Sequence, residues 1–303
     1  MIFSKIKDWK LIMNHEPVML NEVLEFIQNH NHSKILDGTL GLGGYSEAIL
    51  KNFPDCFVLG LDRDNQAINF ACERLKIFGS RFSARHEKFS NIENISDINS
   101  FDVYVFDLGV SNMQLSIPER GFSFQNEGSL DMRMNPDENS LTAAEVLRTS
   151  DEKTLAKIFF DYGEERHSKL IASAIKKSKS PLTTTTDLVN LIRSTLPQPL
   201  QRKMGTHPAR RIFQALRIYV NDETKELEIL LKALKNLKNN SLIIFVSYHS
   251  IEDRLVKKNF REWQNENLGK ILTKHPLTPS DNEIERNYKS RSAKLRAFCL
   301  IQD

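Results

Sequence analysis

The sequence predicts an α/β protein in which a mostly parallel sheet is interrupted by an inserted helical domain. Two observations lead to this prediction. Short strands that are apolar throughout alternate with helices in the first third of the chain, and more than a hundred residues then separate the fourth strand from the next of equal quality. Continuously apolar strands are typical of parallel sheets that helices cover on both faces.

Hydrophobic periodicity divides the first third of the chain into alternating helices and strands. In chain order these segments are Val18–Asn29 (helix), Lys34–Thr39 (strand), Ser46–Asn52 (helix), Cys56–Asp62 (strand), Asn65–Phe78 (helix), Arg81–His86 (strand) and Val103–Leu108 (strand). This alternation predicts a doubly wound, Rossmann-like sheet with crossover helices.

The long middle stretch is mostly helical in pattern and predicts an inserted domain. A crossover between parallel strands needs only about a dozen residues. We therefore assign residues 115–221 to the insertion, and residues 1–114 and 222–303 to the sheet domain. The expected helices of the insertion are Asp151–Phe160, Glu164–Lys177, Asp187–Leu196 and Ala209–Val220.

After the insertion the pattern of the sheet domain resumes. Asp222–Leu237 is the expected crossover helix and Leu242–Ser247 the fifth strand. Lys294–Ile301 alternates enough to be a last strand, which we place as an antiparallel edge. The polar tract Gln264–Ser290 is interpreted as a loop.

The composition is that of a globular protein with an ordinary core. Of the 303 residues, 40% are hydrophobic and 27% are charged, which matches soluble domains in general. A net charge of +3 permits a nucleic-acid partner without requiring one. The segment Arg202–Arg217 is a stronger indication, because it holds five basic residues and no acidic one.

The cysteines and the first residues of the chain point to the cytoplasm. Cys56, Cys72 and Cys299 lack metal-ligand spacing, and an odd number cannot form a closed disulfide framework. We therefore expect no metal. The first ten residues carry lysines without a long apolar run, so we expect neither a signal peptide nor a membrane span.

The glycine-rich turn Asp37–Gly44 is the first candidate ligand site. Glycines let the backbone turn sharply and approach a ligand closely, and the helix that follows offers unpaired N–H groups. Such a turn also serves dinucleotides and phosphates, and a tight structural turn would use the same residues.

Asp62, at the end of the second strand, could accept hydrogen bonds from both ribose hydroxyls of an adenosine. NAD and S-adenosylmethionine both carry this group, so the spacing of the turn has to distinguish them. A dinucleotide turn follows the pattern G-x-G-x-x-G, whereas Asp37 opens this one. An acid there would repel a pyrophosphate but could suit the ammonium of a methionine moiety, which favours S-adenosylmethionine.

The loop after the fourth strand lies at the edge where open α/β sheets bind their ligands. Methyl transfer to an exocyclic base amine requires groups that orient the nitrogen and accept a proton. Asp107, Ser111 and Gln114 are suitable. By local pattern alone, Ser111 and Asn112 more often form hydrogen bonds within their own turn.

His249 follows the fifth strand and so lies at the same edge. It could move a proton or contact a substrate. Equally, it could order its loop while Glu252 or Asp253 caps the helix that begins there.

Several blocks of sequence, in order, resemble one known family. They are 15–20 (HEPVML), 119–124 (ERGFSF), 130–134 (LDMRM), 162–166 (YGEER), 207–211 (HPARR), 213–218 (FQALRI) and 290–296 (SRSAKLR). With the glycine turn, they make the chain similar nearly end to end to the bacterial small-subunit rRNA (cytosine-N4)-methyltransferase family, RsmH/MraW.

The resemblance implies a class I methyltransferase sheet with an inserted helical substrate-recognition domain. It implies S-adenosylmethionine as cofactor and 16S rRNA of the small ribosomal subunit as substrate, methylated on N4 of the cytidine at position 1402. The implied cofactor contacts are Gly43, Gly44, Tyr45, Asp62, Phe89, Asp107 and Gln114. The expected RNA contacts in the basic insertion are Arg133, Arg210, Arg211 and Arg217.

This sequence departs from the family pattern at four positions. Tyr45 stands where the family usually has His, Asn112-Met113 where it has Ser-Pro, and Ser116 where it has an acid. The absence of proline loosens the predicted loop that carries Gln114.

Two alternative functions remain open at this point. The chain could methylate an amine in another nucleic acid, a protein or a small molecule, or it could be an adenosine-ligand sensor without catalysis. The presence of Asp62, Asp107 and Gln114 argues against the sensor. Sequence alone does not distinguish a monomer from a homodimer.

Overall fold

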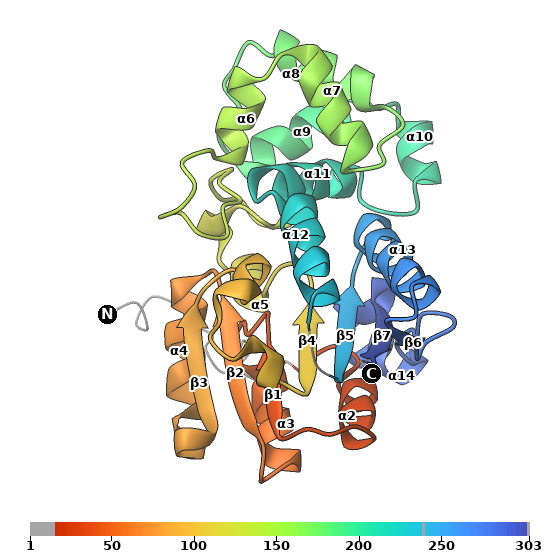
Figure 1. Ribbon diagram of the computed structural model, residues 1–303. Coiled ribbons are helices and arrows are strands. Elements are labelled where there is room, and N and C mark those ends of the chain that lie inside the picture. The colour runs from red at the N-terminus through yellow and green to blue at the C-terminus, as the bar shows by residue number, and fades with distance from the viewer. Residues whose placement is uncertain (1–15, 238–239, 302–303) are drawn as a thin grey trace. The chain divides into compact units, whose positions relative to one another are not determined.

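The computed structural model describes residues 16–237 and 240–301, which form two compact units (Figure 1). The first unit comprises the chain up to Ser111 and from Thr224 onward, and the second comprises Asn112–Glu223. The expectation about a leader or membrane span in the first ten residues lies outside the described residues, as does His15 of the first family block.

The first unit is built on one seven-stranded sheet with the order β3-β2-β1-β4-β5-β7-β6. Its strands are β1 (Lys34–Asp37), β2 (Phe57–Asp62), β3 (Phe82–His86), β4 (Val103–Asp107), β5 (Ser241–Ser247), β6 (Gly269–Ile271) and β7 (Lys294–Leu300). The first five strands pair in parallel, and β7 is antiparallel to both β5 and β6. This order and the antiparallel pair confirm the predicted class I methyltransferase sheet.

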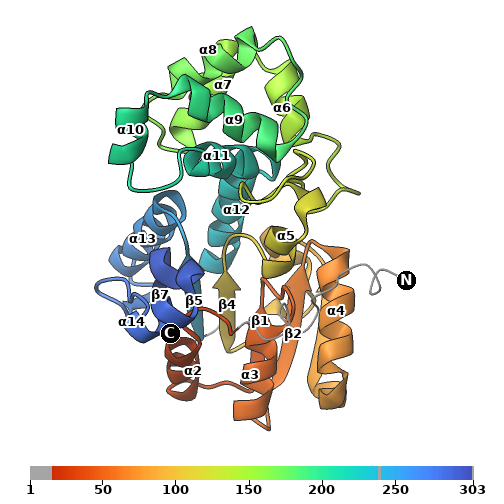
Figure 2. The same ribbon diagram turned by 180° about the vertical axis from the view of Figure 1, so that it is seen from behind.

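Helices cover both faces of this sheet (Figures 1 and 2). The six helices described in this unit are α2 (Leu20–Gln28), α3 (Gly44–Asn52), α4 (Asn65–Leu75), α12 (Glu223–Lys235), α13 (Ser250–Asn265) and α14 (Asp281–Arg286). Buried side chains of α2 and α3 share one core with Val58, Val105 and Ile244. Those of α12 and α13 share the core on the other face with Tyr104 and Phe245.

The predicted elements of the sheet are confirmed to within a few residues, with two corrections in the last quarter of the chain. β7 is antiparallel as predicted, but it is not an edge strand, because β6 pairs with its far side. The interpretation of Gln264–Ser290 as a loop is wrong, since this tract contains β6 and α14. β6 has only three residues, too few for a period-2 pattern, and its conformation depends on pairing with β7.

The second unit is helical apart from its loops. Its helices are α5 (Asn112–Ser116), α6 (Ala143–Thr149), α7 (Glu152–Asp161), α8 (Ser168–Lys177), α9 (Thr185–Thr195), α10 (Gln198–Lys203) and α11 (Arg210–Val220). The prediction that α8 begins at Glu164 is wrong by one turn, because Glu164 has a φ of 49° and separates α7 from α8. Gly163 lies so close to α11 that an added Cβ would meet the backbone oxygen of Arg211 at 2.6 Å.

Among the helices that the structure describes, none combines the length and the apolar character needed to cross a membrane.

The packing of α13 against the sheet generates a stability prediction. Trp263 is 1% exposed, and its ring lies 5.3 Å from that of Phe260 and 5.4 Å from that of Phe298 on β7. We expect Trp263→Ala to lower the free energy of unfolding by about 3–5 kcal/mol, because it removes a large buried side chain and leaves a cavity. Urea unfolding followed by circular dichroism measures this change.

Ile77→Ala is the matched control, since Ile77 is 73% exposed and its truncation should change stability by less than about 0.5 kcal/mol. Equal losses in the two variants would contradict the packing role of Trp263.

Candidate functional site

The parallel register brings the ends of four strands to one edge of the sheet. Asp37 of β1 pairs with Gly60 of β2 and Val105 of β4, and Asp107 of β4 pairs with Val246 of β5. The segments that follow these strands carry most of the candidate site residues. The carboxyl edge of the sheet is therefore the place where these residues meet.

The glycine turn connects β1 to α3 through two left-handed glycines. Gly41 has a φ of 51° and Gly43, the N-cap of α3, has a φ of 78°. Both conformations are strained for residues with a side chain, which explains glycine there. Gly44 and Tyr45 form the first turn of α3, where backbone N–H groups have no acceptor within the helix. The turn thus presents hydrogen-bond donors at the sheet edge.

Asp37 stabilises this turn through hydrogen bonds from both sides of it. Its carboxylate is fully buried and accepts hydrogen bonds from Ser46 Oγ at 2.7 Å and from the backbone N–H of Thr39 at 3.3 Å. Burial raises its pKa to about 6. The sequence suggested direct contact between Asp37 and a ligand ammonium, but the carboxylate has no exposed surface with which to make it. Its role in the structure is to connect β1 to α3.

Asp62 connects the ends of β1 and β2. Its Oδ2 accepts from the N–H of Gly41 at 2.7 Å and its Oδ1 from the N–H of Asp64 at 2.8 Å. Asp64 in turn caps α4 by accepting from the N–H of Gln66. Burial raises the pKa of Asp62 to about 6, although its side chain keeps some exposed surface. Each carboxylate oxygen still has a lone pair for a ligand hydroxyl.

Asp107 lies at the end of β4, between the glycine turn and the end of β5. Its N–H donates to Thr39 Oγ1 at 2.6 Å, and its Oδ1 accepts from the Tyr248 hydroxyl at 2.7 Å. Burial raises its pKa to about 7, and the charges of Asp37 and Glu252 act in the same direction.

The three carboxylates share an unusual electrostatic environment. Burial raises the pKa of Asp37, Asp62 and Asp107. In the part of the chain that the structure describes, no lysine or arginine lowers the pKa of any of them. Buried carboxylates are normally paired with cations, because desolvation of an unpaired charge is costly. This edge of the sheet is therefore suited to a positively charged ligand and unsuited to a pyrophosphate.

Phe89 packs against Phe106, the residue before Asp107 on β4, in the core on the other face of the sheet. Its ring packs edge-on against Phe106 with 6.3 Å between the centroids. Ser90, the next residue, donates to the carboxylate of Glu226 on α12 and so anchors this segment. A flat aromatic surface at the sheet edge is compatible with the adenine contact that the resemblance implies for Phe89.

Tyr45 is almost completely buried in the core under α3. It is 4% exposed, and its hydroxyl donates to the carbonyl oxygen of Val18. The Tyr45 side chain, which stands where the family usually has His, therefore packs in the core. Only the backbone N–H of Tyr45 remains as its ligand group.

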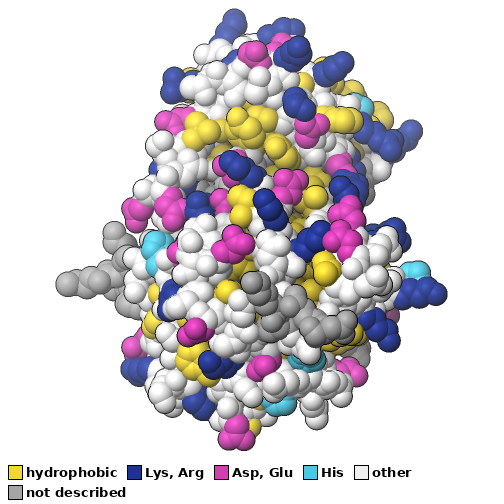
Figure 3. Space-filling view, viewed as in Figure 1, with side chains coloured by type: hydrophobic (Ala, Val, Ile, Leu, Met, Phe, Trp, Pro, Cys, Tyr) yellow, Lys and Arg dark blue, Asp and Glu magenta, His cyan; other side chains and the backbone are white. Residues whose placement is uncertain are grey.

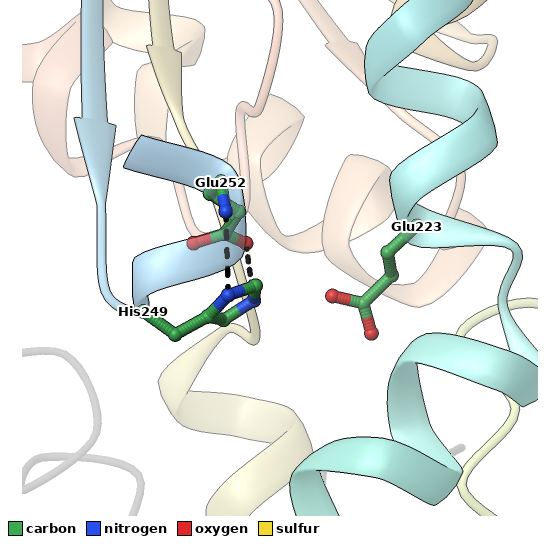
Figure 4. A group of neighbouring side chains, drawn as sticks. All are labelled: Glu223, His249 and Glu252. Carbon is green, nitrogen blue, oxygen red and sulfur yellow. Dashed lines mark hydrogen bonds and ion pairs between the residues drawn. The ribbon is translucent and has the colours of Figure 1, made fainter. Parts of the chain in front are cut away.

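His249 is the N-cap of α13 (Figure 4). Its Nδ1 accepts from the N–H of Glu252, and its Nε2 lies 3.0 Å from Glu252 Oε1, off the direction of a regular hydrogen bond. Glu252 also accepts from the N–H of Tyr248 at 3.0 Å. Of the two interpretations of His249, the structure shows the capping role, with His249 itself as the cap. Asp253 instead pairs with Lys294 and Arg296 of β7.

The remaining candidate residues stay predictions. Ser111 lies next to the glycine turn, since a Cβ added to Gly41 would lie 4.0 Å from the Cβ of Ser111. Gln114 belongs to the helical unit, where it is 5% exposed. α5 begins at Asn112 and includes Met113, so the segment is helical without the family proline. Ser116 ends this helix with an exposed side chain.

The four candidate RNA-binding arginines differ in their surroundings. The guanidinium of Arg133 forms a bidentate ion pair with the Asp131 carboxylate, with both N···O distances at 2.7 Å. The guanidinium of Arg217 pairs in the same way with Glu223, with both N···O distances at 2.8 Å. The Arg211 side chain is 46% exposed, more than those of Arg133 and Arg217. Its Nη1 lies 3.9 Å from Oε2 of the buried Glu165. Arg210 begins α11 and has internal contacts.

Tyr248 and Thr39 both contact Asp107 directly, although the sequence patterns predict no role for either. Both stand inside motifs that had already been singled out, the strand end before His249 and the glycine turn. Their position at strand ends was the available signal. The side chains that reach Asp107 are decided by strand pairing, and the sequence patterns do not reveal which strands pair.

Comparison with known proteins supports this picture. Residues 12–301 match the model of the MraW methylase family. The chain is 44% identical over 305 residues to a protein of Carboxydothermus hydrogenoformans, with 94% of this chain and 97% of that protein covered. It is 46% identical to one of Nostoc sp. (94% and 92% covered) and 41% identical to one of Thermotoga neapolitana (95% and 97% covered).

All three relatives carry the name ribosomal RNA small subunit methyltransferase H. A family match over nearly the whole chain, on a sheet of the predicted class, identifies the kind of enzyme. The chain belongs to the MraW methylase family and is a methyltransferase that uses S-adenosylmethionine.

Proposed function

We propose that the chain transfers a methyl group from S-adenosylmethionine to N4 of a cytidine in small-subunit rRNA, namely cytidine 1402 of 16S rRNA. The substrate is proposed from the name shared by relatives at 41–46% identity. We place the reaction in the cytoplasm, where ribosomal subunits are assembled in bacteria.

The observation that carries the proposal is the set of buried acids at the sheet edge, for which residues 16–237 and 240–301 supply no cationic partner. S-adenosylmethionine supplies a methyl group on a positively charged sulfur and also bears an ammonium. Such a ligand would supply the positive charge that, among the described residues, no lysine or arginine supplies to Asp62 and Asp107. The donor and acceptor set therefore fits this cofactor.

Each residue at the edge has a definite task in this arrangement. Asp62 accepts from the ribose hydroxyls, and the first turn of α3 at Gly44 and Tyr45 donates backbone N–H groups. The N–H of Gly43 donates to the carbonyl oxygen of Leu40, so Gly43 contributes a close backbone approach to the cofactor rather than a donor. Phe89 packs against the adenine. Gln114 completes the proposed cofactor contacts.

The cytosine amine is a poor nucleophile, because its lone pair is delocalised into the ring. Asp107 can accept a hydrogen bond from this amine and take up its proton, because it is a carboxylate at the sheet edge whose proton affinity burial increases. Ser111 is a second acceptor on the same loop. His249 is less suited, because protonation of Nδ1 would break the cap of α13.

We further propose residues 115–221 as the substrate-recognition domain and residues 1–114 and 222–303 as the methyltransferase domain. On the face shown in Figure 3, Lys and Arg side chains are scattered over the upper part, among acidic and hydrophobic ones. Phosphate contacts by such side chains release counterions and favour RNA binding. Arg211, the more exposed of the paired arginines, is the first candidate contact.

Transfer of tritium from labelled S-adenosylmethionine to undermethylated small subunits tests the proposed activity. We expect incorporation into rRNA, with the methyl group mapped to a cytidine N4. Cofactor binding without incorporation would contradict it. Incorporation into another nucleic acid, a protein or a small molecule would identify a different amine substrate.

Removal of the Asp62 carboxylate should weaken cofactor binding. We expect Asp62→Ala to raise the cofactor Kd by at least about tenfold, because hydrogen bonds to a charged group contribute about 1.5–3 kcal/mol each. Calorimetry measures this change. Asp55→Ala, which removes an exposed acid, is the matched control and should leave the Kd unchanged. An unaltered Kd in Asp62→Ala would remove Asp62 from the site.

Cofactor affinity should rise with pH between about 5 and 8. The pKa values of Asp62 and Asp107 are raised to about 6 and 7 in the free protein, so both carboxyls are protonated at pH 5 and become ionised as the pH rises. A cationic cofactor binds the ionised forms better, and its binding should release protons. Calorimetry in buffers of different ionisation enthalpy measures both effects. Affinity that falls over this range would contradict the assignment.

Neutralisation of Arg211 should weaken RNA binding alone. We expect Arg211→Gln to reduce the slope of log Kd against log salt concentration by about 1, with an unchanged cofactor Kd. Lys76→Gln removes one charge from the exposed surface of the sheet unit and is the matched control. Equal loss of RNA and cofactor binding in Arg211→Gln would indicate unfolding rather than a lost phosphate contact.

A further inference from the structure

Tyr248 is the first residue after β5 and lies beside the end of β4. Val246 pairs with Asp107 in parallel register, so these two side chains share one face of the sheet. Tyr248 follows Val246 by two residues and therefore continues on that face. This placement brings a phenol hydroxyl to the carboxylate proposed to act on the substrate amine.

Both ends of Tyr248 are held in place. Its hydroxyl donates to Asp107 Oδ1 at 2.7 Å. Its backbone N–H donates to Glu252 Oε2 at 3.0 Å, within the cap of α13. Gly109, with a φ of 106°, passes close to the ring, since an added Cβ would lie 3.5 Å from Tyr248 Cδ2. The ring is therefore fixed between the β4 loop and the start of α13.

We propose that Tyr248 is a positioning residue for methyl transfer, whose hydroxyl holds the Asp107 carboxylate in one orientation and leaves Oδ2 for the substrate amine. This inference rests on the proposed function, because it assigns a task to Tyr248 at the same site. Tyr248 itself need not touch the substrate.

The hydrogen bond also favours the ionised form of Asp107. The groups that face this carboxyl are Asp37 from β1, Glu252 from α13, Tyr45 from α3 and Tyr248 itself. The two acids raise the pKa of Asp107, as burial does, and the Tyr248 hydroxyl lowers it. Without this hydroxyl the pKa of Asp107 would rise from about 7 to a higher value, and less Asp107 would be ionised at neutral pH.

Tyr248→Phe tests the proposal, because it removes the hydroxyl and keeps the packed ring. We expect kcat/KM to fall about tenfold at pH 7 and to recover in part above pH 8.5, as the acidic limb of the pH profile moves to higher pH. Carbon-13 NMR of labelled aspartate in the free protein should show Asp107 titrating at higher pH than in the wild type.

Tyr104→Phe is the matched control. Tyr104 lies on β4, its hydroxyl donates to the carbonyl oxygen of Ile98, and it faces the core opposite to Asp107. This variant also loses one buried hydroxyl and should keep the wild-type pH profile and Asp107 titration.

A Tyr248→Phe variant with the wild-type pH profile and an unshifted Asp107 titration would overturn the proposal. A uniform loss of activity at every pH, with an unshifted titration, would also overturn it and leave Tyr248 a packing residue. If the wild-type protein transferred no methyl group to rRNA, the proposed function would fail. In that case the NMR titration alone would decide whether Tyr248 controls Asp107.

Discussion

The parallel pairing of β1 with both β2 and β4 is the constraint on which the site depends. Because these strands run in the same direction, their carboxyl ends lie together, and residues far apart in the sequence meet at one edge. Asp62 can then accept from the N–H of Gly41, and Thr39 can accept from the N–H of Asp107. The glycine turn is thus shaped by contacts from two neighbouring strands as well as by its own residues.

Such an edge carries an electrostatic cost in the free protein. Carboxyls whose pKa is raised by burial bind protons more strongly in the folded state than in the unfolded chain. Their contribution to stability is therefore greatest at low pH and is lost as the pH rises through about 6 to 7. A positively charged cofactor offsets this loss by stabilising the ionised carboxylates. Stability and cofactor binding are linked through the same groups.

Several residues that looked functional in the sequence also have structural contacts. Asp37 holds the glycine turn, His249 caps α13, and the Arg133 side chain is held by Asp131. Conversely, Tyr248 drew no functional interpretation from its pattern, yet it contacts Asp107. Residue type and local spacing identify which edge of the sheet matters. They do not determine which side chain is satisfied internally and which remains for a ligand.

The sequence by itself determined the order of the first five strands and their crossover helices, the glycine turn with Asp62, and the family, because these depend on local periodicity, turn chemistry and motif identity. It also predicted S-adenosylmethionine, which the family match confirms. Tertiary structure decided that β7 lies inside the sheet, that Asp37 is wholly buried, and that Tyr248 donates to Asp107. These last features arise from contacts between segments up to 141 residues apart. Such contacts leave no periodic trace in the sequence, since they follow from strand register and burial.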